Sequence, residues 1–454
     1  MRSFMEGNLW PALPSQRGAA LLSLLFQLDE TQWWAPERLM EHQLLQLQAL
    51  LRHAWETVPY YRMRLGAAGY RPDGALDLAG WRSLPLLTRR DIQNAGKTLT
   101  TLRLPPEYAP TMEVQTSGST GQPVKVVGTQ LDALKWEAIT LREHLWHRRD
   151  PSGRLAVIRA NAPGSGGSAS VTMLEDWGPP ASVVFETAPA AAMSFSVDVA
   201  TQAGWLKRHA PEYLLTYPNN LMALIRHFAA RNERLPRLRE VRTIGETVTP
   251  ELRAACREAL NVPVVDAYSS QELGYLALQC PASGLYHVMA ESVMVEILAA
   301  DGTPCAPGET GRVVATSLHN FAMPLVRYEL NDYAEAGGPC PCGRGLPTIA
   351  RIRGRSRNML RLPGGGERWP LVGFDRYREI APIRQYQLIQ HTLEEIEARF
   401  VADRPLTGEE EGQLARVIQT SLDHPFRVSF TYLEGEIPRG PGGKFEEFVS
   451  KVVS

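Results

Sequence analysis

A short run of hydroxyl-bearing and glycine residues in the first third of the chain could bind phosphate. It consists of Thr116, Ser117, Gly118, Ser119, Thr120 and Gly121. The glycines let the backbone bend and expose its N–H groups, and the hydroxyls add donors, so the loop could surround anionic oxygens. It is not a Walker loop, because no Gly-Lys-Ser or Gly-Lys-Thr follows at the required spacing. An ordinary polar turn has the same composition, so both interpretations stay open for the loop alone.

A second group of residues could bind a metal. It consists of Cys280, His287, Cys340 and Cys342, spaced as Cys-x6-His and Cys-x-Cys among glycines and prolines. Thiolates with an imidazole are the ligands of a closed, structural zinc site, which would pin two loops together without touching a substrate. The spacing is not that of a standard zinc finger, so four unrelated residues are the alternative. Cys256 and Cys305 are interpreted as ordinary thiols.

The elements that must position these groups follow an α/β pattern. Short β-rich runs alternate with helical stretches, which predicts a layered body. The expected strands are 155–158, 241–244, 262–268 and 312–317, and the expected helices are 39–58, 132–148 and 250–260. Asp132 is the expected N-cap of its helix, and Pro59 is expected to stop the first one.

The composition changes after Leu360. Residues 361–370 read RLPGGGERWP, a connection that continues neither a helix nor a strand easily. A hairpin (385–391 and 396–401), a helix (409–421) and a strand (427–433) are expected beyond it. We therefore predict an α/β fold with a large N-terminal domain, residues 1–356, and a small α+β cap domain, residues 357–454.

The bulk composition excludes some classes of protein. The 454 residues carry a net charge of -1, so no excess of positive charge indicates a nucleic-acid partner or an anionic membrane. No apolar run is long enough to span a bilayer, and the segment 18–28 is interpreted as a buried or docking helix. The five cysteines are an odd number in a large chain, which favours a reducing compartment. We expect a cytoplasmic protein with neither a nucleic-acid nor a membrane partner.

The segment TSGSTGQP, residues 116–123, resembles the phosphate loop of the adenylate-forming superfamily, which includes acyl-CoA ligases, carrier-protein adenylation domains and luciferases. Four further segments resemble motifs of that superfamily in the same order. They are Tyr268–Glu272, Arg327–Asp332, Arg351–Ser356 and Gly443–Lys444. The combination of MPLVRYELND, CPCGRGLP and RIRGRSRNML is most similar to the phenylacetate-CoA ligase branch. Some members of that branch carry a structural metal from positions like those of the cysteines and histidine.

The resemblance implies where ATP would bind. The loop would hold the β- and γ-phosphates, and Glu272 would bind Mg²⁺, which favours a few hard carboxylates beside substrate phosphates. Tyr268 would lie against adenine, with Gly245 and Glu246 along the edge of the base. Without the resemblance, Glu272 would be interpreted as a surface carboxylate and Tyr268 as a core aromatic. Gly245 and Glu246 would be interpreted as a turn at the end of a strand.

The resemblance also implies a ribose site and a catalytic lysine. Asp332 would accept hydrogen bonds from both ribose hydroxyls, and Arg355 would reach the same sugar or the α-phosphate. Lys444 would offset the charge that develops when a carboxylate attacks the α-phosphorus. An exposed lysine and a solvated arginine are the plainer alternatives.

The expected reaction is ATP-dependent conversion of a carboxylic acid, with aromatic acids among the candidates, to an acyl-adenylate and pyrophosphate. The acyl group would then pass to CoA, with a mobile cap domain serving both steps. The residues GGGERWP at positions 364–370 depart from the pattern Asn-Val-Phe-Pro that helps to form the CoA-side surface of this branch. An amine, a hydroxyl or a carrier-protein thiol is therefore the alternative acceptor. A third hypothesis, a non-catalytic nucleotide-binding scaffold, conflicts with the presence of Glu272, Asp332 and Lys444.

Overall fold

The computed structural model describes residues 1–115, 124–160, 171–355, 359–368, 374–435, 437–438 and 445–452. The chain divides into two compact units. Within the described part, the first unit comprises residues 1–115, 124–160, 171–330 and 334–352. The second comprises residues 331–333 and the C-terminal part from residue 353. The predicted domain boundary, between residues 356 and 357, lies close to this last break.

The helices of the first unit begin where capping residues or prolines permit it. They are α1 (Gln16–Thr31), α2 (Pro36–Thr57), α3 (Pro59–Ala67), α4 (Leu78–Ser83), α5 (Arg89–Ala95), α6 (Gln130–Trp146), α7 (Ala181–Val184), α8 (Val199–His209), α9 (Pro218–Ala230) and α10 (Pro250–Leu260). The predicted helix 250–260 is confirmed as α10. The helix α2 ends before Pro59, as predicted. Pro59 is also the first residue of α3, since proline suits the first position of a helix.

The prediction that Asp132 caps its helix is wrong. Thr129 is the N-cap of α6, and its hydroxyl accepts a hydrogen bond from the backbone N–H of Asp132 at 3.2 Å. The Asp132 carboxylate in turn accepts from the backbone N–H of Thr129 at 2.8 Å. Asp132 is thus the third helical residue of a capping box, a place where a carboxylate also favours the start of a helix.

A twelve-stranded sheet within the described residues forms the centre of the large body. In sheet order its strands are β11 (Val293–Leu298), β12 (Thr310–Ser317), β13 (Tyr328–Ala336), β14 (Thr348–Arg355), β10 (Tyr286–Val288), β9 (Gly274–Gln279), β8 (Val264–Ser270), β7 (Glu240–Thr243), β6 (Tyr213–Thr216), β3 (Leu155–Arg159), β5 (Ala190–Ser194) and β4 (Thr172–Leu174). The neighbours β5, β3, β6, β7 and β8 pair in parallel. Parallel pairing requires crossover connections, and α8, α9 and α10 lie in three of them.

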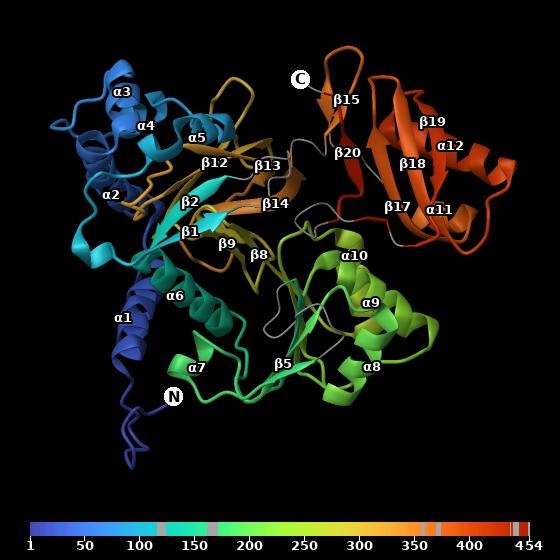
Figure 1. The fold of residues 1–454 in the computed structure, drawn as a ribbon, viewed down its shortest axis with the longest axis horizontal. Coiled ribbons are helices and arrows are strands. Elements are labelled where there is room, and N and C mark those ends of the chain that lie inside the picture. Colours follow the sequence, from blue (N-terminus) through green and yellow to red (C-terminus); the bar gives the residue numbers. More distant parts are fainter. Residues whose placement is uncertain are drawn as a thin grey trace. The chain divides into compact units, whose positions relative to one another are not determined.

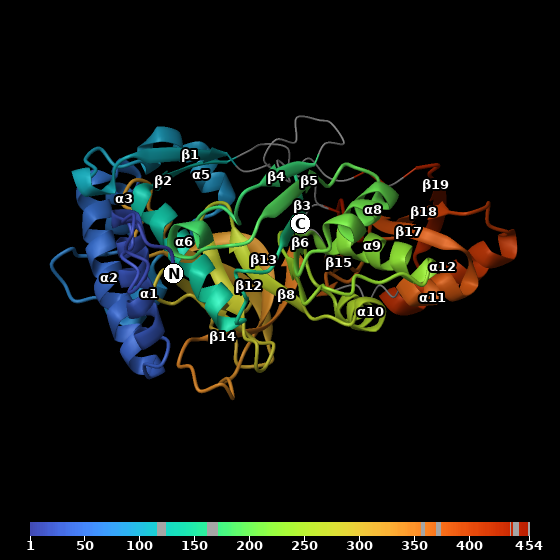
Figure 2. The same cartoon turned by 90° about the horizontal axis from the view of Figure 1, so that it is seen from below.

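The helices pack on the sheet through their apolar sides. Figure 1 shows α8, α9 and α10 side by side next to the parallel strands. They bury a cluster that includes Leu206, Leu224, Phe228 and Leu252 against strand residues such as Ile158. Figure 2 shows α1 and α2 at the end of this unit that is remote from these three helices. No helix within the described residues is both long and apolar enough to cross a membrane.

The second unit is a small α+β body. Its elements are β15 (Leu360–Arg361), β16 (Glu367–Arg368), α11 (Phe374–Ile380), β17 (Ile383–Gln390), β18 (Glu395–Ala402), α12 (Gly408–Leu422), β19 (Arg427–Tyr432) and β20 (Phe448–Ser450). Four strands form a sheet in the order β19-β18-β17-β20, and α11 and α12 pack together beside it (Figure 1). The predicted hairpin is β17–β18 and the predicted helix is α12. The α/β fold with a small C-terminal α+β part is therefore confirmed.

Candidate active site and cysteine–histidine cluster

Glu272 lies in the tight connection between β8 and β9, which are antiparallel neighbours. The turn is held locally, because the Ser270 hydroxyl accepts a hydrogen bond from the backbone N–H of Leu273 at 3.0 Å. The Arg89 guanidinium at the start of α5 lies 3.8 Å from the Glu272 carboxylate, and both side chains are largely buried. The structure thus holds a carboxylate at the end of a strand, beside a cation. Sequence reasoning missed Arg89, since nothing in its local sequence marks it as a partner for a residue so far along the chain.

Tyr268 is placed on β8 and is 7% exposed. Its side chain belongs to the main hydrophobic cluster, together with Ala277 of the neighbouring strand. The register of β8 against β9 shifts between Tyr268 and Ser269, directly after this residue. This placement favours the interpretation as a core aromatic, and contact with adenine stays a prediction.

Gly245 and Glu246 follow β7, as expected from the sequence. Gly245 has a φ of 78°, a left-handed conformation that glycine adopts without strain. The Glu246 carboxylate accepts hydrogen bonds from the backbone N–H of Asn219 at 3.0 Å and from its side-chain amide at 3.1 Å. Asn219 lies in the first turn of α9, where unpaired N–H groups and the helix dipole favour a negative charge. Glu246 therefore fixes the turn after β7 to the start of α9.

Asp332 and Arg355 are brought together on β13 and β14. The Arg355 Nε lies 3.8 Å from a carboxylate oxygen of Asp332, and the side chains of Arg355 and Asp332 are 35% and 18% exposed, respectively. Asn331, which precedes the aspartate, has a φ of 58°, so the strand departs from regular extended geometry there. A partly buried carboxylate paired with a guanidinium can accept from a vicinal diol while the cation stays available to an anion.

Seven predicted site residues, the loop 116–121 and Lys444, lie outside the described residues. The strands that flank the loop are described. They are β1 (Thr111–Gln115) and β2 (Lys125–Thr129), which pair antiparallel with Gln115 opposite Lys125. The candidate phosphate loop thus occupies the connection of a hairpin.

The four proposed metal ligands lie together. The ligand atoms of Cys280, His287, Cys340 and Cys342 are all within 4.8 Å of one another. The sulfurs of Cys340 and Cys280 are 3.8 Å apart, and the His287 Nε2 lies 3.2 Å from the sulfur of Cys342. Antiparallel pairing of β10 with both β9 and β14 brings the first two residues to the last two.

The pKa shifts of His287 and Cys342 suit a metal, whereas burial raises the pKa of the Cys340 thiol. Burial lowers the pKa of His287 to about 4, so its imidazole is neutral at pH 7. Its other nitrogen, Nδ1, lies 3.4 Å from the backbone carbonyl of Leu346, and such a bond orients a ligating ring. Burial raises the pKa of the Cys342 thiol, but hydrogen bonds from the Arg344 backbone and from Cys340 more than offset it, and the net shift is downward.

Comparison with known proteins gives a consistent set of relatives. No established protein-family profile matches the sequence. The chain is 27% identical over 350 residues to the phenylacetate-coenzyme A ligase of Escherichia coli K12, covering 74% of this chain and 76% of that protein. It is 25% identical over 447 residues to the phenylacetate-coenzyme A ligase of Thermus thermophilus, covering 90% of this chain and 95% of that protein.

Solved structures with the same fold are also found. A 2-hydroxyisobutyryl-CoA ligase in its post-adenylation state superposes with a TM-score of 0.69 at 16% identity, over 93% of this chain and 92% of that one. An anthranilate CoA ligase in complex with anthranoyl-AMP superposes with a TM-score of 0.51 at 17% identity, over 73% and 65%. These likenesses establish the fold.

Proposed function

We propose that this chain is an adenylate-forming enzyme of the phenylacetate-CoA ligase-like branch. On this premise, it activates a carboxylic acid with ATP and transfers the acyl group to CoA. The observation that carries the proposal is the similarity to phenylacetate-coenzyme A ligases over 74% of the chain. The side chains of Glu272, Asp332 and Arg355 support it, because the two carboxylates could bind Mg²⁺ and ribose hydroxyls, and the guanidinium could bind the sugar or the α-phosphate.

The phosphate end of ATP would lie at the β1–β2 hairpin. Its connecting loop, residues 116–121, would donate backbone N–H and hydroxyl groups to the β- and γ-phosphates. Glu272 fits a Mg²⁺ ligand, because it is a hard oxygen donor held at a strand end. When bound, Mg²⁺ would offset part of the phosphate charge.

The nucleoside end would be held by the pair on β13 and β14. Asp332 would accept from the two ribose hydroxyls, and Arg355, 3.8 Å from it, would stay oriented by that carboxylate while reaching the sugar or the α-phosphate. Charge-assisted hydrogen bonds of this kind are roughly twice as strong as neutral ones. Gly245, Glu246 and Tyr268 would form the surroundings of the adenine.

Two transfers would follow. A carboxylate oxygen of the acid attacks the α-phosphorus, the bond to the β-phosphate breaks, and pyrophosphate leaves. Lys444 would stabilise the negative charge that accumulates in this step. The thiol of CoA then attacks the acyl carbon, AMP leaves with the bonding electrons, and the thiol proton passes to solvent. An amine, a hydroxyl or a carrier-protein thiol would react at the same carbon.

We further propose that the cysteine–histidine cluster binds a structural Zn²⁺ through Cys280, His287, Cys340 and Cys342. In a tetrahedral site with zinc–sulfur bonds of about 2.3 Å, two sulfurs lie about 3.8 Å apart. The distance between the sulfurs of Cys340 and Cys280 is 3.8 Å. The metal would tie the β9–β10 connection to the segment before β14. Five cysteines, an odd number in a large chain, fit a reducing, cytoplasmic location. The net charge of -1 fits a protein with neither a nucleic-acid nor a membrane partner.

The acceptor can be tested directly. A panel of aliphatic and aromatic acids is incubated with ATP and Mg²⁺, with and without CoA, and both pyrophosphate and acyl products are measured. The proposal expects at least one acid to give pyrophosphate together with an acyl-CoA. Pyrophosphate release that CoA never accelerates, with acyl transfer to an added amine instead, would favour an amide-forming ligase.

A further inference from the structure

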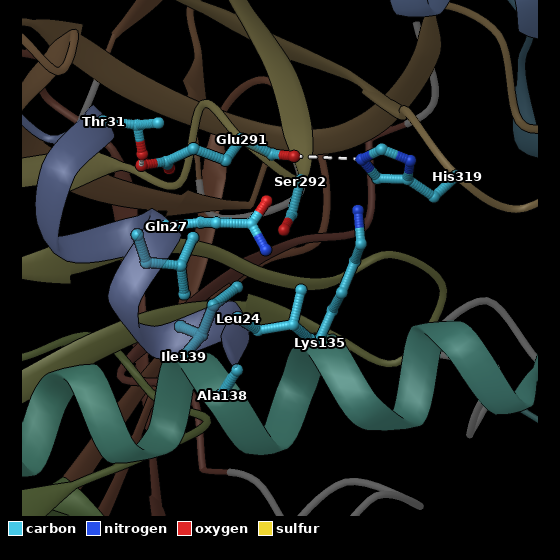
Figure 3. Close-up of a pocket in the computed structure, with 10 residues that line it drawn as sticks. Leu24, Gln27, Thr31, Lys135, Ala138, Ile139, Glu291, Ser292 and His319 are labelled. Carbon is cyan, nitrogen blue, oxygen red and sulfur yellow. Dashed lines mark hydrogen bonds between the residues drawn. The ribbon is translucent and has the colours of Figure 1, made fainter. Parts of the chain in front are cut away.

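A small pocket lies in the first unit between α1, α6 and the segment that leads into β11. Its volume is about 200 Å³. The residues that line it are Leu24, Gln27, Leu28, Thr31, Lys135, Ala138, Ile139, Glu291, Ser292 and His319. None of them has a part in the proposed reaction or in the zinc cluster. Figure 3 shows the apolar side chains along the two helices and the polar groups of Glu291, Ser292 and His319 opposite them.

The polar groups of the pocket differ in how they are satisfied. The Glu291 carboxylate accepts from the Arg142 guanidinium at 2.7 Å and from the Thr31 hydroxyl at 2.7 Å. The His319 Nε2 lies 3.0 Å from the backbone carbonyl of Glu291 (Figure 3). The Lys135 amine, by contrast, makes no hydrogen bond or ion pair with any described residue, and Figure 3 shows it pointing from α6 toward Ser292 and His319. Because the Lys135 amine is mostly buried and points into the pocket, it is available to bind a ligand there.

Burial, and not the charges around it, weakens the positive charge of the Lys135 amine. Burial lowers the pKa of Lys135 to about 7, against the opposing charges of Asp132 and Glu291. Burial also lowers the pKa of His319 to about 4, so this ring stays neutral at physiological pH. Burial raises the pKa of Glu291, but Arg142 more than offsets this, and the carboxylate stays charged. Burial raises the pKa of Asp132 from 3.8, against the hydrogen bonds from Thr129.

We propose that this pocket binds a small organic carboxylate, with its apolar body between α1 and α6 and its carboxylate against the Lys135 amine and the Ser292 hydroxyl. An anion would supply the counter-charge that the amine lacks, since Glu291 is already engaged by Arg142. The apolar walls of Leu24 and Ile139 would cover a hydrocarbon body. The volume is below the roughly 300–1,000 Å³ of sites for drug-sized ligands, so the ligand is of the size of a single ring.

The proposal makes binding depend on pH. A carboxylate is held by the protonated amine, so above pH 7 the ligand must recruit a proton to Lys135. The affinity should therefore fall about tenfold for each pH unit above 7. His319 and Glu291 keep their charge states over this range, because their pKa values lie below it.

The test uses calorimetric titration of the full chain with benzoate between pH 6.5 and 8.5. Wild type should show the decline in affinity and proton uptake at the higher pH, and the neutral isostere benzamide should bind at least tenfold more weakly at pH 6.5. Lys135→Met should lose this binding while keeping acid-dependent pyrophosphate release. Lys207→Met, which removes an exposed lysine paired with Glu233, is the matched control and should behave as wild type.

Several results would overturn the proposal. They are pH-independent affinity, equal binding of benzamide, or unchanged binding in Lys135→Met. Benzoate held at the reaction site would remain in that variant as residual binding, so the two sites can be told apart. Loss of pyrophosphate release in a folded Lys135→Met protein would instead assign the pocket to the substrate. The comparison of benzoate with benzamide on wild type stands even if the variant does not fold.

Discussion

Replacement of Asp332 by asparagine tests the proposed ribose site with little disturbance of the fold. The substitution keeps the size of the side chain and one oxygen acceptor but removes the negative charge. The partner, Arg355, is 35% exposed and 3.8 Å away, so water can solvate it after the change, and an ion pair of this kind contributes at most about 1 kcal/mol. The free energy of unfolding should therefore change by less than about 1 kcal/mol.

The effect on ATP should be much larger. A hydrogen bond to a charged group contributes about 1.5–3 kcal/mol. Loss of one such bond to ribose corresponds to a rise of about 10- to 150-fold in the KM for ATP, at about 1.36 kcal/mol for each factor of ten. Steady-state pyrophosphate release at varied ATP measures this rise, and urea unfolding measures stability.

A control of the same chemistry lies in the same unit. Asp403 pairs with Arg384 at 3.1 Å, and both side chains are more than half exposed. Asp403→Asn should leave the KM for ATP within about twofold of wild type, because this pair has no part in the proposed nucleotide site. An unchanged KM in Asp332→Asn, or an equal rise in both variants, would refute the assignment of Asp332 to the nucleotide.

Three further predictions follow from the lysine, the cysteine–histidine cluster and a buried carboxylate. Lys444→Ala should abolish pyrophosphate release and leave ATP affinity within about tenfold of wild type, because the charge of Lys444 acts mainly in the transition state. An equal loss of the rate of pyrophosphate release, measured by kinetics, and of ATP affinity, measured by nucleotide titration, would contradict this. Protein purified without chelators should carry one zinc per chain by metal analysis, and Cys342→Ser should carry much less; a wild-type content near zero would disprove the site. Glu143 is fully buried between Arg149 at 3.0 Å and Arg242, so Glu143→Gln should lower the free energy of unfolding in urea by about 3 kcal/mol or more, and a loss below about 1 kcal/mol would show that the pair is dispensable.

The stability that Glu143 provides should also depend on pH. Burial raises the pKa of this carboxyl, but the guanidiniums of Arg242 and Arg149 more than offset the effect of burial. The pKa is therefore lowered from 4.5 to about 2. Its contribution is therefore present above pH 4.5 and is lost as the pH falls from there toward 2. In Glu143→Gln, the acid-induced decline of stability over this window should be shallower than in wild type. An identical decline in both proteins would contradict the linkage.

Local patterns predicted the elements well where capping and periodicity act alone. The helix 250–260 has a capping threonine before Pro250, an apolar side and an asparagine after Leu260, and it was predicted at its observed bounds. Asp132 was misplaced because both partners of a capping box are residue types that cap helices, and only the geometry separates them. Strand ends shifted by a few residues, since pairing with neighbours decides where a strand stops.

The candidate site was harder to predict than the elements. The four zinc-ligand candidates were found from residue type, yet their proximity depends on the pairing of β10 with β9 and β14, which spacing does not reveal. Arg89 and Lys135 were not recognised, because their roles come from distant partners and from burial. The core position of Tyr268 likewise depends on what packs over β8.

The central claim, formation of an acyl-adenylate, is tested most directly by acid-dependent exchange of labelled pyrophosphate into ATP in the absence of any acceptor. The exchange requires only the first, reversible transfer, so it does not depend on the identity of the thiol, amine or hydroxyl that follows. We predict exchange with at least one acid of an aliphatic and aromatic panel, with an acyl-adenylate and never ADP as the nucleotide product. No exchange with any acid, or ADP and phosphate as products, would contradict the account.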